Sequence, residues 1–260
     1  MVHIATLLYM ADMSTQTMLV PAKTILPSLE FGAFSPNGKY VLLVCSDSRR
    51  YLMTTDQGRL KYAFGHFASF SLSNFPAATF HNVRFVSDDI VVYPKGSLDD
   101  SRDLEVFSIT KGLALSVLKG HNYSIDLVCL SADGQLVGTA TRDLTTINGV
   151  TEKFIHVWDL ESVSLFSLCR GEGPYTAVTF AGTRREFLFS CSRWSNKVTT
   201  WYVGSKSNPC PEGIPLYQVI GHNDCVHYLL VTPGDGMIVT GSLDNTIKVR
   251  FVVITQHTIY

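Results

Sequence analysis

The chain is built from short apolar stretches separated by small and polar residues. Runs such as "YVLLVC" (40–45), "FIHVWDL" (154–160) and "MIVTGS" (237–242) alternate with clusters of Gly, Asp, Asn, Ser and Pro. Further runs of this kind are "DIVVYP" (89–94), "DLEVFSI" (103–109), "EFLFSCS" (186–192) and "TIKVRFVV" (246–253). Short apolar runs bounded by turn residues predict strands, and helical periodicity is almost absent. The pattern therefore predicts an all-β chain.

The order of runs and turns repeats along the chain. Segments 34–47, 130–143 and 231–244 each contain a strand end, a polar turn with Gly, a second strand, and a small hydroxylated residue before Asp. Two weaker copies lie at 85–96 and 180–192. Gly38 and Gly134 are 96 residues apart, and Gly134 and Gly236 are 102 apart, each interval covering two units. A period of about 50 residues built only of strands predicts a propeller or another repeat array.

A second marker follows the same period. Gly-His occurs at 65–66, 120–121 and 221–222, Gly171-Glu172 takes the fourth place, and Trp158-Asp159 closes one unit. This combination resembles the WD40-repeat β-propeller family. The resemblance implies five units, at about 30–64, 65–119, 120–170, 171–220 and 221–260, with strands of a further closing blade in 1–29. We therefore expect an all-β, WD40-type β-propeller of five to six blades, open or incomplete.

The last unit departs from the family pattern. "GSLDNTIKV" leads to Arg250-Phe251 in the place where the family has Trp-Asp. Propellers of this family usually close with seven blades, more than the repeats account for. Three explanations are open: an open propeller that a partner completes, a fragment of a longer scaffold, or an altered end after Val249. We expect one of the last two.

The resemblance also implies a set of structural residues. In the family, a loop His bonds a turn Asp, a strand hydroxyl and a strand Trp. Carried onto the third unit, these are His121, Thr139 or Thr141, Asp143 and Trp158, with Thr139 preferred. Carried onto the fifth unit, they are His222, Thr240 or Ser242, and Asp244, with Ser242 preferred. Such buried polar groups tie loops to strands, and we interpret them as structural, with Trp201 as the Trp of the fourth unit.

Composition narrows the function classes. The net charge is -1, so no overall field attracts nucleic acid or anionic lipid. The six cysteines show no zinc spacing and lie mostly in apolar runs, which is typical of reduced structural thiols. No apolar run reaches eighteen residues, so no membrane insertion is expected. We expect a cytoplasmic location, with the nucleus as the alternative.

Catalytic signatures are missing from the sequence. No nucleotide-binding loop, zinc-protease motif or nucleophile elbow occurs. The pairs Asp88-Asp89 and Asp99-Asp100 stand in turn-like stretches and are interpreted as solvated loop acids. The sequence predicts a protein that is not an enzyme and needs no cofactor or metal.

Arginines gather in the predicted turns at the Gly-His end of the units. The interpretation of these turns as a partner surface rests on Arg49, Arg50, Arg142, Arg193, Trp194 and Leu243. Trp and Arg are frequent interface anchors, and Arg binds carboxylate and phosphate with two parallel hydrogen bonds. An acidic or phosphorylated peptide would suit this rim. The alternative is that these are ordinary solvated turn residues.

Four segments lengthen the units and are predicted as loops: 67–82, 95–103, 142–153 and 204–215.

Taken together, the sequence features favour a non-catalytic scaffold that presents a propeller surface to protein partners in a larger complex. The alternative is a regulatory WD40 module of a multidomain protein of the BEACH or NACHT type. A chromatin- or RNA-associated propeller is a third, less favoured hypothesis. Fold alone does not fix function, so the choice depends on which surfaces the structure presents.

Overall fold

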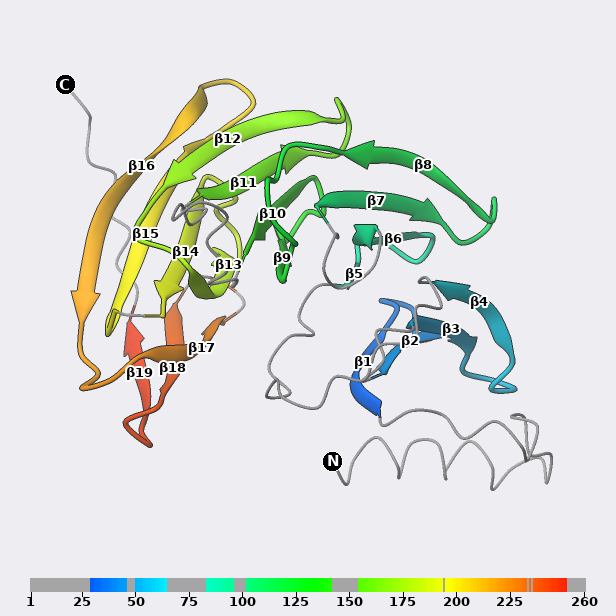
Figure 1. Ribbon diagram of the computed structural model, residues 1–260, viewed down its shortest axis with the longest axis horizontal. Helices are drawn as coiled ribbons and strands as arrows, with labels where there is room; N and C mark the ends of the chain where they lie inside the picture. The colour runs from blue at the N-terminus through cyan, green and yellow to red at the C-terminus, as the bar shows by residue number, and fades with distance from the viewer. Residues whose placement is uncertain are drawn as a thin grey trace. The chain divides into compact units, whose positions relative to one another are not determined.

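A computed structural model of the chain describes residues 29–45, 50–64, 83–95, 102–141, 154–193, 195–232, 234 and 236–251. The chain divides into two compact units, Met1–Gly120 and His121–Tyr260. The all-β prediction is confirmed, because every regular element among the described residues is a strand (Figure 1). Each apolar run quoted above coincides with one of these strands. The strands predicted in 1–29 lie outside the described residues apart from Leu29.

The first unit contains two antiparallel sheets whose strands follow chain order. The first sheet consists of β1 (Leu29–Phe34), β2 (Tyr40–Cys45), β3 (Arg50–Thr54) and β4 (Leu60–Phe64). The second sheet consists of β5 (Arg84–Phe85), β6 (Ile90–Lys95), β7 (Asp103–Ser108) and β8 (Leu113–Leu118). Leu42 and Leu52 of the first sheet share a buried core with Val91 and Phe107 of the second.

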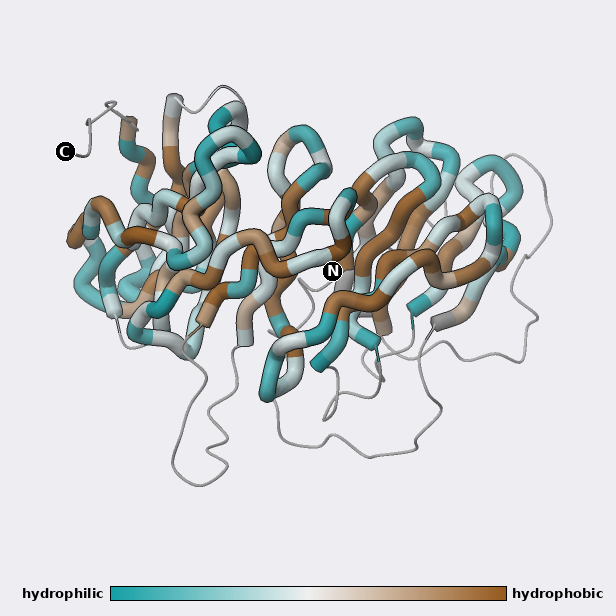
Figure 2. Tube along the Cα trace, turned by 90° about the horizontal axis from the view of Figure 1, so that it is seen from above, coloured by the Kyte–Doolittle hydropathy of each residue, from teal (hydrophilic) through white to brown (hydrophobic). Residues whose placement is uncertain are grey.

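The second unit contains three strand groups. The third sheet consists of β9 (Leu127–Leu130), β10 (Leu136–Ala140), β11 (Phe154–Asp159) and β12 (Ser164–Arg170). The fourth sheet consists of β13 (Tyr175–Phe180), β14 (Phe187–Ser192), β15 (Lys197–Gly204) and β16 (Pro209–Ile220). The fifth sheet has β17 (Val226–Val231), β18 (Met237–Ser242) and β19 (Ile247–Phe251). Figure 2 shows brown, hydrophobic stretches that alternate with teal, hydrophilic bends along the tube.

The prediction of a loop over 204–215 is wrong for most of its length. Residues from Pro209 onward belong to β16, which pairs antiparallel with β15. Near its start β16 also runs parallel to β12, with Leu168 opposite Glu212 and Cys169 opposite Gly213. This second pairing joins the third and fourth sheets into one of eight strands. Pro and polar residues suggested a loop, but Pro is tolerated at the first residue of a strand and at pairing irregularities, and Pro209 begins β16 while the β15–β16 register shifts next to Pro215.

Successive sheets of the second unit pack face to face. The third sheet approaches the fourth at Gly138, where an added Cβ would lie 3.2 Å from Leu188 Cδ1 and 2.7 Å from Cys129 Sγ. The fourth sheet meets the fifth through Phe189 and Val226, which share a buried core against which the partly buried Ile238 packs. The fourth sheet therefore uses one face against the third sheet and the other against the fifth.

Two further features bear on the kind of protein. Across the described residues no helix has the length and apolar character that a membrane crossing requires. All six cysteines are free, and only Cys210 is not buried. Burial, with a smaller contribution from Cys210 and Cys129, raises the pKa of the Cys169 thiol to about 12, so at neutral pH this side chain is an unreactive core residue.

Candidate functional site

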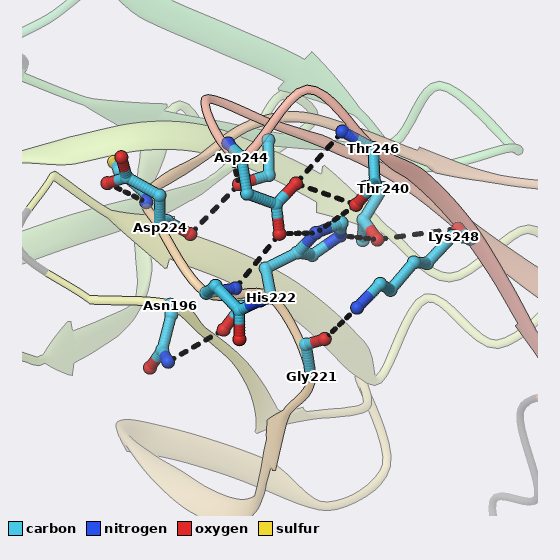
Figure 3. Close-up of polar contacts among 11 residues, drawn as sticks. Asn196, Gly221, His222, Asp224, Thr240, Asp244, Thr246 and Lys248 are labelled. Atoms are coloured by element: carbon cyan, nitrogen blue, oxygen red, sulfur yellow. Dashed lines mark hydrogen bonds and ion pairs between the residues drawn. The ribbon is translucent and has the colours of Figure 1, made fainter.

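The best-defined polar cluster lies where the loop before β17 meets β18 and β19 (Figure 3). His222, 3% exposed, lies with Nδ1 2.9 Å from Asp244 Oδ2 and Nε2 2.8 Å from Thr240 Oγ1. The Thr240 hydroxyl in turn donates to the carbonyl of Lys248. Both imidazole nitrogens are thus satisfied, and the ring joins the loop to the centre of the sheet.

Asp244 is the anchor of the adjoining turn. Its carboxylate accepts hydrogen bonds from the amides of Asn223 and Thr246, both at 2.9 Å, and from the Thr246 hydroxyl at 2.6 Å. The Thr246 hydroxyl, these amides and His222 hold the pKa of Asp244 well below its usual range. A depressed carboxyl pKa contributes stability above the unfolded value of about 4, and this stability is lost as the pH falls below it.

The third sheet holds a related cluster. His121 Nε2 lies 2.7 Å from Thr139 Oγ1, and the Trp158 indole donates to the same hydroxyl at 2.8 Å. His156, on the strand that carries Trp158, stacks on the indole, and its Nδ1 lies 2.9 Å from His121 Nε2. Thr139 is fully buried, and His121, His156 and Trp158 are at most 6% exposed.

His156 makes the stability of this cluster depend on pH. Burial and the neighbouring His121 lower the pKa of His156 to about 3, whereas the unfolded value is about 6.5. The folded pKa is depressed, so stability is full above pH 6.5 and falls as the pH drops towards 3. We expect the free energy of unfolding to be about 1.4 kcal/mol lower at pH 5.5 than at pH 7.5. Urea denaturation at both values measures this difference, and His156→Gln, which does not titrate, should flatten it. An equal slope in both proteins would contradict the assignment.

The fourth sheet uses other residues in the same places. The Trp201 indole donates to Ser190 Oγ at 2.9 Å, as Trp158 does to Thr139. Glu172 stands where the other units have His, and a Cβ added to Gly171 would overlap the Tyr175 hydroxyl and lie 3.1 Å from the Trp201 ring. Gly171 therefore lies against both the hydroxyl of the buried Tyr175 and the ring of Trp201.

The structure brings together most of the predicted structural residues and corrects one. His121, Thr139 and Trp158 meet, and so do His222 and Asp244, while Asp143 lies outside the described residues. The choice of Ser242 is wrong, because Thr240 provides the hydroxyl that meets His222. Ser242 lies two residues further along the same face and donates instead to the carbonyl of Asp224 at 2.9 Å.

The predicted partner surface is only partly exposed. Arg193 and Leu243 are exposed, and Arg49, Arg142 and Trp194 lie outside the described residues. Arg50 is wrong as a surface residue: it begins β3, is 4% exposed, and its guanidinium lies 5.9 Å from the centre of the Tyr93 ring. Burial lowers the pKa of Arg50 to about 10. Side chains alternate between the two faces of a strand, and the start of β3 turns this one inward.

Four residues of these clusters were missed from the sequence. His156, Thr246, Lys248 and Asn196 all take part, the last through its amide, which donates to the His222 carbonyl at 2.8 Å. His156 alone carried a usable signal, since it stands two residues before Trp158 and so shares its face of the strand. The other three depend on turn geometry that the sequence does not reveal.

The order Asp244, His222, Thr240 resembles an acid, a base and a hydroxyl nucleophile. The hydroxyl of Thr240 is buried, with the residue 2% exposed, and it already bonds a backbone carbonyl. A nucleophile must reach its substrate, so this arrangement is suited to tying a loop and not to catalysis. Within the described residues, no group of three or more His, Cys, Asp or Glu could hold a metal ion.

Comparison with known families gives one match. The family described as "WD domain, G-beta repeat" matches residues 213–250, which run from the middle of β16 through β17 and β18 into β19. The match includes His222, Thr240 and Asp244 and ends at Arg250. Comparison with curated proteins gave no match. The resemblance seen in the sequence is thus confirmed for one repeat.

Proposed function

We propose that this chain, which carries a WD40 repeat at residues 213–250, is a non-catalytic module that holds protein partners in a larger assembly. WD40 domains generally serve as protein-interaction scaffolds and are typically not catalytic. One observation supports a specific surface for this role, the outer face of the fifth sheet. Its exposed apolar side chains are Tyr228, Leu230, Ile247, Val249 and Phe251.

The outer face has equivalents in the two preceding sheets. By strand pairing, Val239 of β18 occupies the place of Gly138 in β10 and Phe189 in β14, each next to the hydroxyl residue that meets the Trp or His. Gly138 lies against the fourth sheet, and Phe189 packs with Ile238 of the fifth. The equivalent face around Val239 is exposed, with Leu230 at 61% and Val249 at 59%.

The repeated packing also indicates the partner. Soluble proteins rarely leave a contiguous apolar patch uncovered unless it binds something. In this unit such faces are covered by a twisted sheet with alternating apolar side chains. The partner we propose is therefore an apolar β-sheet face of another protein.

A photo-crosslinking experiment tests this face. A benzophenone amino acid in place of Leu230 is expected to crosslink to a strand peptide of another protein, identified by mass spectrometry. The same amino acid in place of Val163, exposed beyond β11, is the control and should not yield that peptide. Leu230→Asp with Val249→Asp should weaken binding of the identified partner roughly tenfold or more. Crosslinks only to a second copy or to the chain itself would contradict a separate partner.

The acidic or phosphorylated peptide predicted for the Arg-rich turns remains a proposal for the Gly-His end. Of its described residues, Arg193 and Leu243 are exposed there. Arg193→Glu should weaken binding of a fluorescent phosphopeptide at least severalfold, since a charge-assisted bond becomes a repulsion. Arg184→Glu, in the turn before β14, is the matched control. Equal affinity of the wild type and Arg193→Glu would remove this part of the proposal.

A further inference from the structure

Arg250 occupies a place that tryptophan takes in the two preceding sheets. Trp158 pairs with Val137 across β10 and β11, Trp201 with Leu188 across β14 and β15, and Arg250 with Ile238 across β18 and β19. In each sheet the hydroxyl residue lies two positions further along the strand opposite the Trp or Arg: Thr139 in β10, Ser190 in β14 and Thr240 in β18. The three sheets thus share one register, and the fifth sheet alone has a cation at this point.

In both the fourth and the fifth sheet a loop glycine lies next to this position. Gly171 lies against the Trp201 ring, and a Cβ added to Gly221 would overlap the Arg250 guanidinium. The tryptophan indoles are 3% exposed and donate to their hydroxyl partners. Arg250 is half-buried, and the hydroxyl of Thr240 meets His222 instead of the side chain of Arg250.

A cavity lies next to Arg250, between the fourth and fifth sheets. Its volume is about 230 Å³, and its walls include Phe189, Val198, Leu216, Ile238, Thr240 and Arg250. An arginine side chain is smaller than the indole at the preceding sheet interface and leaves part of this space open. The volume lies below the 300–1,000 Å³ that is usual for sites of drug-sized ligands, so the cavity suits a molecule with a single ring.

The charge around the cavity is positive. Arg250 is its one charged lining residue, and no acid is among the lining residues. Lys248, two residues earlier on the same face of β19, donates to the Gly221 carbonyl (Figure 3). Within the part of the chain described, Arg250 has no ion-pair partner. A half-buried cation beside apolar walls is costly without a counter-charge, and guanidinium groups bind carboxylates with two parallel hydrogen bonds.

We propose that this cavity binds a small apolar carboxylic acid. The ring or alkyl body of the ligand lies between Phe189, Val198 and Ile238, and its carboxylate meets the guanidinium of Arg250. A phosphate is a weaker candidate, because apolar walls would desolvate its dianion without replacing the lost hydrogen bonds. This site is separate from the outer face of the fifth sheet and does not depend on the proposed scaffold function.

The test uses the whole chain and two probes, 3-phenylpropionate and its uncharged amide. Isothermal titration or ligand-observed NMR should show the acid binding about tenfold or more tightly than the amide, because the amide loses the charge-assisted bonds. Equal affinity of the two probes, or no binding of the acid at millimolar concentration, would overturn the proposal without any variant.

Three variants locate the site. Arg250→Met keeps the apolar stem and should lose the preference for the acid, whereas Arg184→Met, at an exposed arginine in the turn before β14, should keep it. Arg250→Trp should fill the cavity and abolish binding of both probes. Retention of the acid preference in Arg250→Met would show that another group binds the carboxylate, and would also overturn the proposal. The acid-to-amide comparison remains decisive if a variant does not fold.

Discussion

Replacement of Trp201 with alanine is expected to lower the free energy of unfolding of the second unit by about 3–5 kcal/mol. The side chain is 3% exposed and belongs to the core between the third and fourth sheets, together with Leu188, Val157 and Tyr175. Removal of the indole leaves a cavity at the centre of that core, and the surrounding sheets are joined at β12 and β16 and cannot easily close it. Loss of its bond leaves the buried Ser190 hydroxyl without its indole donor as well.

Urea denaturation followed by circular dichroism measures this effect. Trp201→Phe is the control that separates packing from hydrogen bonding, since a phenyl ring fills most of the space and cannot donate to Ser190. It should cost only about 1–3 kcal/mol. Leu243→Ala, at an exposed position, should change the stability little. If Trp201→Ala costs no more than Leu243→Ala, the indole does not have the central role that its burial implies.

Much of the fold follows from the sequence because strand formation is a local matter. Alternation of apolar residues, punctuated by Gly, Asn and Asp, marks the strands that carry His156, Trp158 and Trp201, and their separation shows the repeat. The loop histidines could be placed too, since His121 and His222 each stand at the start of a unit. These features depend on few residues at short range.

The wrong predictions concern positions where strand register or turn geometry decides which side chain makes a contact. Thr240 and Ser242 lie on the same face of β18, so alternation cannot distinguish them, and the loop geometry around His222 selects Thr240. Arg50 is buried because β3 places it on the inward face opposite Val44. The prolines of β16 suggested a loop, but they stand at the start of the strand and next to shifts in its register with β15, where Pro is tolerated. In each case the deciding contact joins residues that are distant in sequence or depends on a turn outside the strand.

Replacement of Gly204 with alanine is expected to destabilise the second unit by about 3 kcal/mol or more, from two separate causes. Gly204 ends β15 with φ +87°, a conformation that costs a residue with a Cβ roughly 1–2 kcal/mol. An added Cβ would also overlap the backbone nitrogen of Cys210 and lie 2.7 Å from the carbonyl oxygen of Asn208. Backbone atoms cannot rotate away as a side chain can, so the hairpin that leads into β16 must shift.

Gly234 provides the matched control for this prediction. Its φ is +88°, almost the same value, and a Cβ added there meets no described atom within 4 Å. Gly234→Ala should therefore show the conformational cost alone, about 1–2 kcal/mol, and the difference between the two variants isolates the steric overlap at Cys210. Thermal unfolding of both variants gives that difference directly.

Since β16 contributes Leu216 to the cavity beside Arg250, a shift of the hairpin should also weaken binding of 3-phenylpropionate in Gly204→Ala and leave it unchanged in Gly234→Ala. Equal destabilisation by both substitutions would show that the hairpin yields freely, and that the tight approach of Gly204 to Cys210 does not position β16.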